Sequence, residues 1–261
     1  MGAQRFDLEG KRVEIAPLSA KNAAAPSDGT HLFCSTGFLD DAWFHRSYWT
    51  YGERFPEGWG EYNQAQKRAP SGRIMAIGES RVFGFRADGL GNTLLPTPTY
   101  RLYAADKSSR AEGAPEDPVA PGKGKRAGKG GKGVGKEGED AIAGGAKVYW
   151  QMHSPPLLVN AMALGGKTLF VAGPPDVADE SKMLGFLPGA DDAANRQLKA
   201  QDEAWHGKKG ALLWVVAAED GQKLAEHKLD SPPIFDGLSV AGGRLYVSTQ
   251  DGRLLCMSGT E

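Results

Sequence analysis

One pattern occurs twice in the chain. Ser154-Pro155-Pro156, eight residues and Gly165-Gly166-Lys167 are followed 77 positions later by Ser231-Pro232-Pro233, eight residues and Gly242-Gly243-Arg244. A looser third copy begins at Pro70. Self-similarity at a fixed spacing is typical of a repeat architecture. Because proline cannot donate to a sheet ladder, each Ser-Pro-Pro predicts a turn that leads into the second strand of a unit.

The final copy predicts four short strands joined as a meander. They cover residues 223–229, 238–241, 245–249 and 254–257. Gly242-Gly243 and Asp251-Gly252 lie between these strands, and glycine reaches positive φ without penalty, so both pairs predict tight hairpins. Four short consecutive strands of this kind are typical of one propeller blade.

The preceding copy predicts the same blade with an insert. Its strands cover residues 148–152, 160–164, 168–172 and 212–217. The insert, residues 174–209, contains a predicted helix from about Ala193 to His206. Asp191 or Asp192 provides the N-cap, and Gly207 ends the helix.

An earlier copy uses residues 73–77, 81–85 and 100–105, and residues 32–35 begin part of one more. We therefore predict an all-β fold over residues 1–258, a β-propeller of four-stranded blades with one short inserted helix. Because propellers close with about four to eight blades, about three to four blades here indicate part of a larger ring of about seven or eight. Open blade edges predict dye binding or association, including a homodimer.

Composition narrows the possibilities further. Residues 107–146 hold 11 glycines and no aromatic residue, so they have too little apolar surface to form a core, and we interpret them as a disordered insert. The chain has 31 basic and 32 acidic residues, which argues against a nucleic-acid partner. No apolar run reaches the length of a transmembrane helix, and the first residues lack the apolar stretch of a secretory signal.

Residues 43–62 hold eight aromatic side chains, which suits a stacking surface for a sugar, a quinone or a partner protein. The alternative is that they cover one end of the propeller. Nearby carboxylates and a histidine suggest an acid/base pair or a metal site, but their spacing matches no metal motif. No catalytic or metal-ligating residue is therefore assigned. The candidate binding residues are Asp40, Asp41, Trp43, His45, Arg46, Trp49 and Trp59.

Residues 213–224, Leu-Trp-Val-Val-Ala-Ala-Glu-Asp-Gly-Gln-Lys-Leu, resemble the repeat of PQQ-like (quinoprotein alcohol dehydrogenase-like) β-propellers. That repeat has a strand, a small and acidic turn with Gly-Lys, and then the next strand. The resemblance covers about residues 73–106 and 147–258. The family includes quinoprotein alcohol dehydrogenases and the propeller lipoprotein that assists outer-membrane protein assembly. The family carries a tryptophan after Gly-Lys, and at or next to that position this chain has Ala225. Dehydrogenase members of the family also have two adjacent cysteines near the quinone, and this chain has no such pair.

The resemblance implies a non-catalytic propeller module for protein interaction or assembly, which binds a protein partner or the remaining blades through loops at one end. It also implies an extracytoplasmic location, in the periplasm or at the cell surface. No cofactor is expected in this case. Two alternatives remain open. One is the C-terminal half of a PQQ-dependent quinoprotein oxidoreductase, which would hold PQQ with calcium. The other is a carbohydrate-binding propeller.

Overall fold

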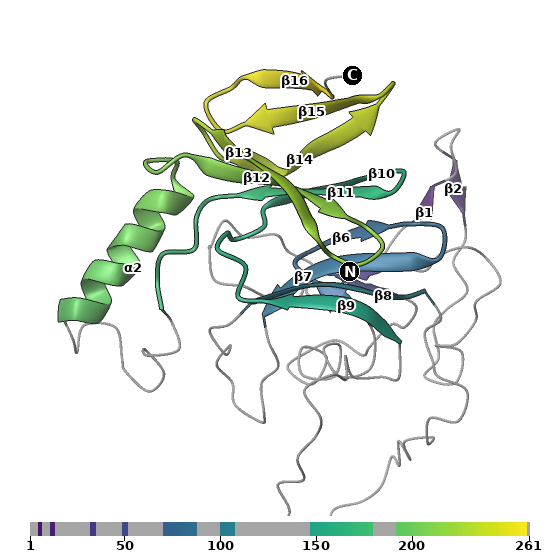
Figure 1. Ribbon diagram of the computed structural model, residues 1–261, viewed down its shortest axis with the longest axis horizontal. Helices are drawn as coiled ribbons and strands as arrows, with labels where there is room; N and C mark the ends of the chain where they lie inside the picture. The colour runs from purple at the N-terminus through teal and green to yellow at the C-terminus, as the bar shows by residue number, and fades with distance from the viewer. Residues whose placement is uncertain are drawn as a thin grey trace, which may run out of the picture.

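The computed structural model describes residues 5–6, 11–13, 32–34, 49–51, 70–87, 100–107, 147–179 and 192–259. In this part of the chain, three antiparallel sheets are stacked face to face, with a helix at one side (Figure 1). The predicted all-β class with an inserted helix is confirmed.

Each of the three sheets consists of consecutive strands in sequence order. The first sheet contains β6 (Ile74–Ile77), β7 (Arg81–Ala87), β8 (Tyr100–Asp106) and β9 (Val148–His153). The second sheet contains β10 (Ala161–Gly165), β11 (Thr168–Gly173), β12 (Ala211–Ala217) and β13 (Lys223–Leu229). The third sheet contains β14 (Pro233–Ala241), β15 (Arg244–Thr249) and β16 (Leu254–Ser258).

Two smaller antiparallel sheets precede these three in sequence. One contains β3 (Leu32–Cys34), β4 (Trp49–Tyr51) and β5 (Ser71–Gly72). The other contains β1 (Arg5–Phe6) and β2 (Arg12–Val13). Only Arg73 separates β5 from β6, so the small sheet leads directly into the first sheet.

Glycine forms the hairpins at the predicted places. Gly242 and Gly243 have φ of +57° and +71°, as a type I′ turn between β14 and β15 requires. Gly252 has φ of +83° in the turn before β16, where the Thr249 N–H donates to the Arg253 carbonyl at 2.9 Å. In the earlier copy the turn falls one position later, at Gly166 and Lys167. The gapless sequence match therefore does not give an identical turn.

The predicted grouping of strands into blades is wrong by one strand. The strand predicted to open each copy pairs with the sheet before it: β9 pairs with β8, and β13 pairs with β12. Ser-Pro-Pro therefore separates two sheets, which is reasonable because proline cannot continue a ladder. Pro155, Pro156 and Pro232 lie outside strands as predicted. Pro233 is the first residue of β14, which is a position that an edge strand tolerates.

Two apolar layers hold the three sheets together. Along β12, Trp214 belongs to the layer facing the first sheet, and its neighbour Leu213 belongs to the layer facing the third. The second sheet is thus buried on both faces, which explains its continuous apolar runs. Its strand β10 contacts both β6 and β14, so the first strands of all three sheets lie next to one another.

Trp150 joins the first sheet to the second. Its Nε1 donates to the Ala218 carbonyl at 3.0 Å, in the turn between β12 and β13. Gly221, in the same turn, has φ of +78°, and a Cβ there would lie 2.7 Å from the Trp150 ring. Arg81 donates to the Ala218 and Glu219 carbonyls at 3.1 and 2.6 Å. Trp150 is the third residue of β9, the place that Ala225 takes in β13.

Helix α2 (Asp192–Trp205) confirms the predicted inserted helix, and Gly207 follows it with φ of +83°. Gln201 fixes the helix to the segment after β11. Its Oε1 accepts from the Val177 and Ala178 N–H groups at 2.8 and 3.1 Å. Among the described residues, no helix combines the length and the apolar character needed to cross a membrane.

Candidate functional site

The residues directly before β6 and β10 and the first residues of β14 meet the end of helix α2 at one place. They are brought together because the first strands of the three sheets are neighbours. Contacts between these segments link five residues, which we call the junction site. They are Arg73, Asn160, Trp205, Phe235 and Asp236.

Arg73 is the buried cation of the junction site, with 3% of its surface exposed. Its guanidinium carbon lies 4.6 Å from the ring centre of Trp205 and 5.6 Å from that of Phe235. Burial of a charge is costly, and cation–π contacts with two aromatic faces offset part of that cost. Arg73 thereby connects the first sheet with helix α2 and with β14.

Asn160 connects the second sheet with the third. Its Nδ2 donates to the Pro233 carbonyl at 2.9 Å, and its own carbonyl accepts from the Asp236 N–H at 2.9 Å. Both bonds join Asn160, which directly precedes β10, to the first residues of β14. They fix the backbone on either side of Phe235 and so hold its ring near Arg73.

Asp236 has a backbone conformation that few residues other than glycine adopt. Its φ is +56°, which costs on the order of 1–2 kcal/mol for an ordinary L-residue and less for aspartate. The side chain reaches solvent, yet the surrounding protein removes enough water to raise the pKa of its carboxyl. Strain and a perturbed carboxyl at one residue are typical of functional positions.

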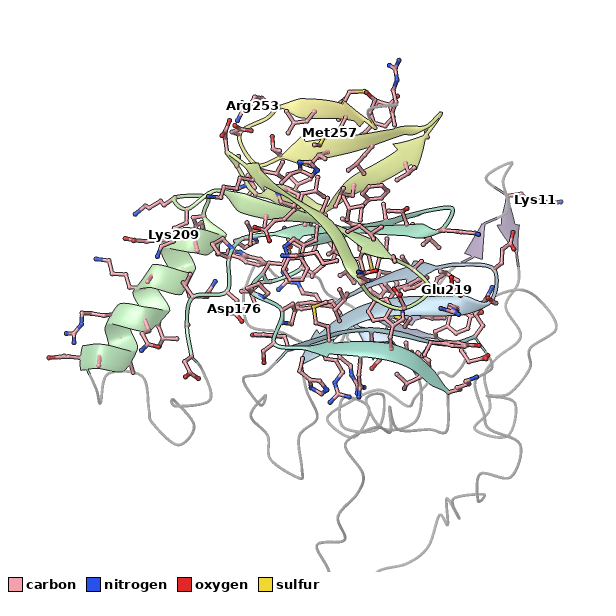
Figure 2. All side chains as sticks on the ribbon, in the orientation of Figure 1. Lys11, Asp176, Lys209, Glu219, Arg253 and Met257 are labelled. Atoms are coloured by element: carbon pink, nitrogen blue, oxygen red, sulfur yellow. The ribbon has the colours of Figure 1, made fainter. Side chains whose placement is uncertain are left out.

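Asp176 is a second perturbed carboxyl, in the segment that packs on helix α2 (Figure 2). Burial raises its pKa from 3.8 to about 6, and the charge of Asp179 adds to this shift. Gln201 donates to the Pro175 carbonyl at 3.2 Å and so holds the backbone directly before Asp176. The helix therefore positions this carboxyl in a partly dehydrated environment.

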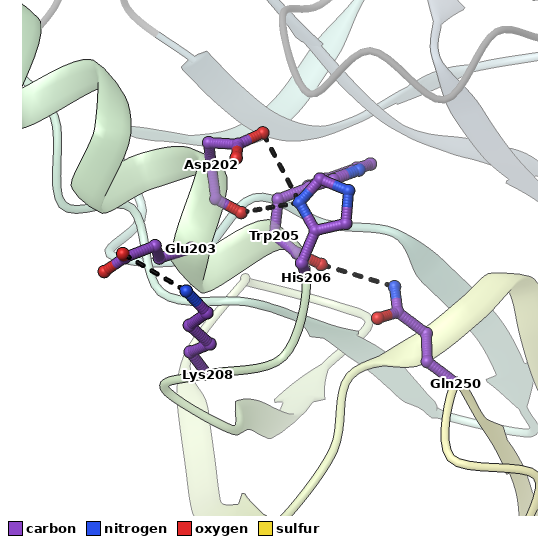
Figure 3. Close-up of polar contacts among 6 residues, drawn as sticks. All are labelled: Asp202, Glu203, Trp205, His206, Lys208 and Gln250. Atoms are coloured by element: carbon purple, nitrogen blue, oxygen red, sulfur yellow. Dashed lines mark hydrogen bonds and ion pairs between the residues drawn. The ribbon is translucent and has the colours of Figure 1, made fainter.

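The end of helix α2 is tied to the third sheet (Figure 3). The Trp205 carbonyl accepts from the Gln250 Nε2 at 3.4 Å, in the turn before β16. Asp202 and His206 form an exposed contact at 3.3 Å, and Lys208 reaches Glu203 at 3.2 Å. Exposed pairs of this kind contribute little stability, whereas the buried Trp205 side chain packs in the apolar layer between the first and second sheets.

Of the residues predicted as a binding site, the structure describes only Trp49. It lies in β4, opposite Cys34 in β3 and Gly72 in β5. Gly72 directly precedes Arg73, so Trp49 lies in a strand neighbouring the approach to the junction site. The remaining candidates lie outside the described residues: Asp40, Asp41, Trp43, His45, Arg46 and Trp59.

The junction site is the candidate functional site of the described residues. No family model matches the chain, and no curated protein matches it. Within the described residues, no group of three or more histidine, cysteine, aspartate or glutamate side chains is placed to hold a metal ion. The site combines a buried cluster of a cation and aromatic rings with an exposed carboxyl on a strained backbone, and that carboxyl is the group that suits recognition of a polar ligand.

Sequence reasoning missed Arg73, Asn160 and Asp236. One signal for Asp236 was present, since Asp236-Gly237 is a turn dipeptide whose aspartate tolerates positive φ. Arg73 and Asn160 carry no such signal. They are the first residues of two predicted strands, 73–77 and 160–164, and only the packing of three sheets brings them together.

Proposed function

We propose that the chain is a segment of a β-propeller that acts as a non-catalytic protein-interaction module, with its partner bound at Asp236 and Ile234, on the exposed side of the junction site. Three consecutive sheets packed face to face support the propeller arrangement. The adjacency of β6, β10 and β14 supports a common axis, since the first strand of each sheet then lies innermost.

The contact of Trp150 with the second sheet supports the resemblance to PQQ-like propellers. The turn that it contacts, at Ala218 and Gly221, lies within the stretch that carries the resemblance. The same kind of contact would repeat from blade to blade if β13 carried a tryptophan at Ala225. Regular docking is therefore incomplete in this chain, and we place its function at the beginning of β14 rather than in a quinone site.

The observation that carries the proposed binding function is the strained backbone of Asp236, which presents an exposed carboxyl. Strain of this kind persists where surrounding contacts enforce it, and it clusters at binding and catalytic sites. Ile234, two residues earlier, is an exposed apolar side chain on the same strand. We expect a protein partner that offers a hydrogen-bond donor or a cation to Asp236 and an apolar group to Ile234.

The test is site-specific photo-crosslinking from Ile234 in extracts of the source cells. We expect one predominant crosslinked protein, and its yield should fall about tenfold with Asp236→Asn, as for a charge-assisted bond worth about 1.4 kcal/mol. Asparagine tolerates the same φ, so the fold should be kept. The control position is Leu224 in β13, which is also exposed and should not give this product.

Three results would contradict the proposal. A crosslinking yield that is equal at Ile234 and Leu224, or unchanged by Asp236→Asn, would remove the junction site as the contact. Dye-linked alcohol oxidation after addition of PQQ and calcium would favour the oxidoreductase alternative. Specific binding on a glycan array would favour the carbohydrate-binding alternative.

A further inference from the structure

The third sheet has one strand fewer than the first and second sheets. Its order is β14-β15-β16. In the first and second sheets the third strand is followed by a fourth, whereas β16 is the last strand of its sheet. Among the described residues, β16 pairs only with β15. Figure 1 shows β16 at the far end of the stack, with no labelled strand beyond it.

The alternation of backbone hydrogen bonds identifies the groups on the open edge of β16. The Thr249 N–H donates to the Arg253 carbonyl at the hairpin, so Thr249 and Arg253 are a hydrogen-bonded pair of the β15–β16 ladder. In an antiparallel pair, every second residue then bonds to the neighbour, which makes Leu255 and Met257 the residues that bond to β15. The N–H and C=O groups of Leu254, Cys256 and Ser258 consequently point to the open edge.

The composition of β16 is that of a strand with a neighbour on both sides. Natural edge strands are protected by charged residues, and β13, the outermost strand of the second sheet, carries Lys223, Glu226 and Lys228. The five residues Leu254–Ser258 include no charge. Leu254 is 67% exposed, the largest fraction among the exposed large apolar side chains of the described residues.

We propose that β16 pairs antiparallel with β16 of a second copy of this chain, about a two-fold axis at Cys256. A two-fold axis at Cys256 sets that residue opposite its own copy, and a short strand without charges brings no like charges together along the paired edge. The axis sets Leu254 opposite Ser258 of the second copy, and Leu255 opposite Met257. The open-edge groups then form three residue pairs with two bonds each, about six hydrogen bonds.

The same pairing extends the apolar layer between the second and third sheets. Leu255 and Met257 already pack against that layer while remaining partly exposed. Across the axis, Leu255 of one copy becomes a neighbour of Met257 of the other, on the same face of a six-stranded sheet. A short strand pair buries less than the ~1,200 Å² of a stable interface, so we expect a dissociation constant of about 10–100 µM. This inference does not depend on the proposed function.

The first test measures the mass of the full chain by sedimentation at increasing concentration. We expect a shift from monomer to dimer, which Cys256→Val should retain and Cys256→Pro should weaken more than tenfold. Proline at this position removes one N–H on the open edge but no bond to β15, whereas valine keeps that N–H. Circular dichroism and the melting temperature establish that the two variants are folded alike.

A second measurement uses the thiol of Cys256, which is exposed. In a Cys34→Ser background, a short bismaleimide should link two copies, and Leu254→Lys should reduce the linked fraction because it replaces an exposed apolar side chain on the paired edge by a charge. Leu254→Lys also tests the proposal by sedimentation if Cys256→Pro does not fold. A chain that stays monomeric at about 100 µM, or a dimer that neither variant weakens, overturns the proposal.

Discussion

At the scale of single residues, Trp150 shows how one side chain joins two layers. Its ring lies over Gly221 and its Nε1 bonds to Ala218, so it contributes apolar burial and a directional bond to the same turn. Gly221 is required there for two reasons. Its φ is positive, and any Cβ would collide with the indole. The turn and the tryptophan thus form one unit of packing.

We expect Trp150→Ala to lower the free energy of unfolding by about 3–5 kcal/mol, because it leaves a large cavity between two sheets. Trp150→Phe keeps much of the burial but loses the bond to Ala218, and should cost about 1–2 kcal/mol. The control is Tyr149→Phe, which removes the bond from the neighbouring hydroxyl to Asp106 at 2.9 Å. Urea denaturation measures all three, and an equal loss for Trp150→Phe and Tyr149→Phe would contradict this role.

The carboxyl of Asp176 predicts a pH dependence of stability. Its pKa in the folded protein is about 6 against an ordinary value of 3.8, so the folded state holds this proton more tightly than the unfolded chain. The resulting stabilisation is full below the unfolded pKa of 3.8 and is lost as the pH rises through about 6. Desolvation raises the pKa of Asp236 in the same direction and adds to this trend.

Asp176→Asn should therefore raise the free energy of unfolding at pH 7 by about 1–2 kcal/mol, a value reduced for the partial exposure of the carboxyl. Its stability profile should also become flatter between about pH 4 and 6, with the remaining slope from Asp236. Asp179→Asn is the comparison, and it should give only part of the increase in the free energy of unfolding, because it removes the charge of Asp179 but not the burial of Asp176. Urea denaturation at each pH provides the measurement, and a steeper profile for Asp176→Asn would refute the assignment.

At the scale of elements, local signals in the sequence predicted the hairpins and the helix. Gly242-Gly243, Asp251-Gly252 and the cap and end of helix α2 each depend on a few neighbouring residues. Which sheet a strand joins is a different question. A strand such as β13 is preceded by a turn and followed by Ser-Pro-Pro, and both sides look like boundaries. The pairing of β13 with β12 decides which sheet β13 joins, and this pairing depends on contacts between sheets.

The β8–β9 connection shows that a long insert need not disturb a sheet. The Asp106 N–H donates to the Lys147 carbonyl at 2.8 Å, so the two strands already meet where the insert begins and ends. The predicted disorder of residues 107–146 falls, apart from Lys107, outside the described residues. That prediction accordingly stays a prediction.

Replacing residues 108–146 by a short Gly/Ser turn should change the melting temperature by less than about 5 °C, because the composition of the insert offers little apolar surface for a core and a shorter loop is slightly easier to close. Differential scanning calorimetry of the two chains makes the comparison. A fall of more than about 5 °C would mean that the insert packs on the sheets.

At the scale of the whole molecule, the three sheets differ in how well they are covered. Among the described residues, the second sheet has an apolar layer on each face, whereas the third sheet has one apolar layer and an open edge at β16. The sequence predicted a stack of repeated sheets because its repeats are regular. It did not predict the junction site, because that site consists of unrelated residues from three repeats and an insert that meet only once the stack is formed.

The order of the sheets along the chain also matters while the protein is being made. Each sheet is drawn from consecutive strands, so a hairpin can close in about 1–10 µs once its residues leave the ribosome. Translation proceeds at about 5–20 residues per second, and the third sheet, residues 233–258, therefore arrives about 1–5 s after the second. During that interval the apolar face around Leu213 is uncovered in the nascent chain, which gives chaperones a defined period in which to bind it.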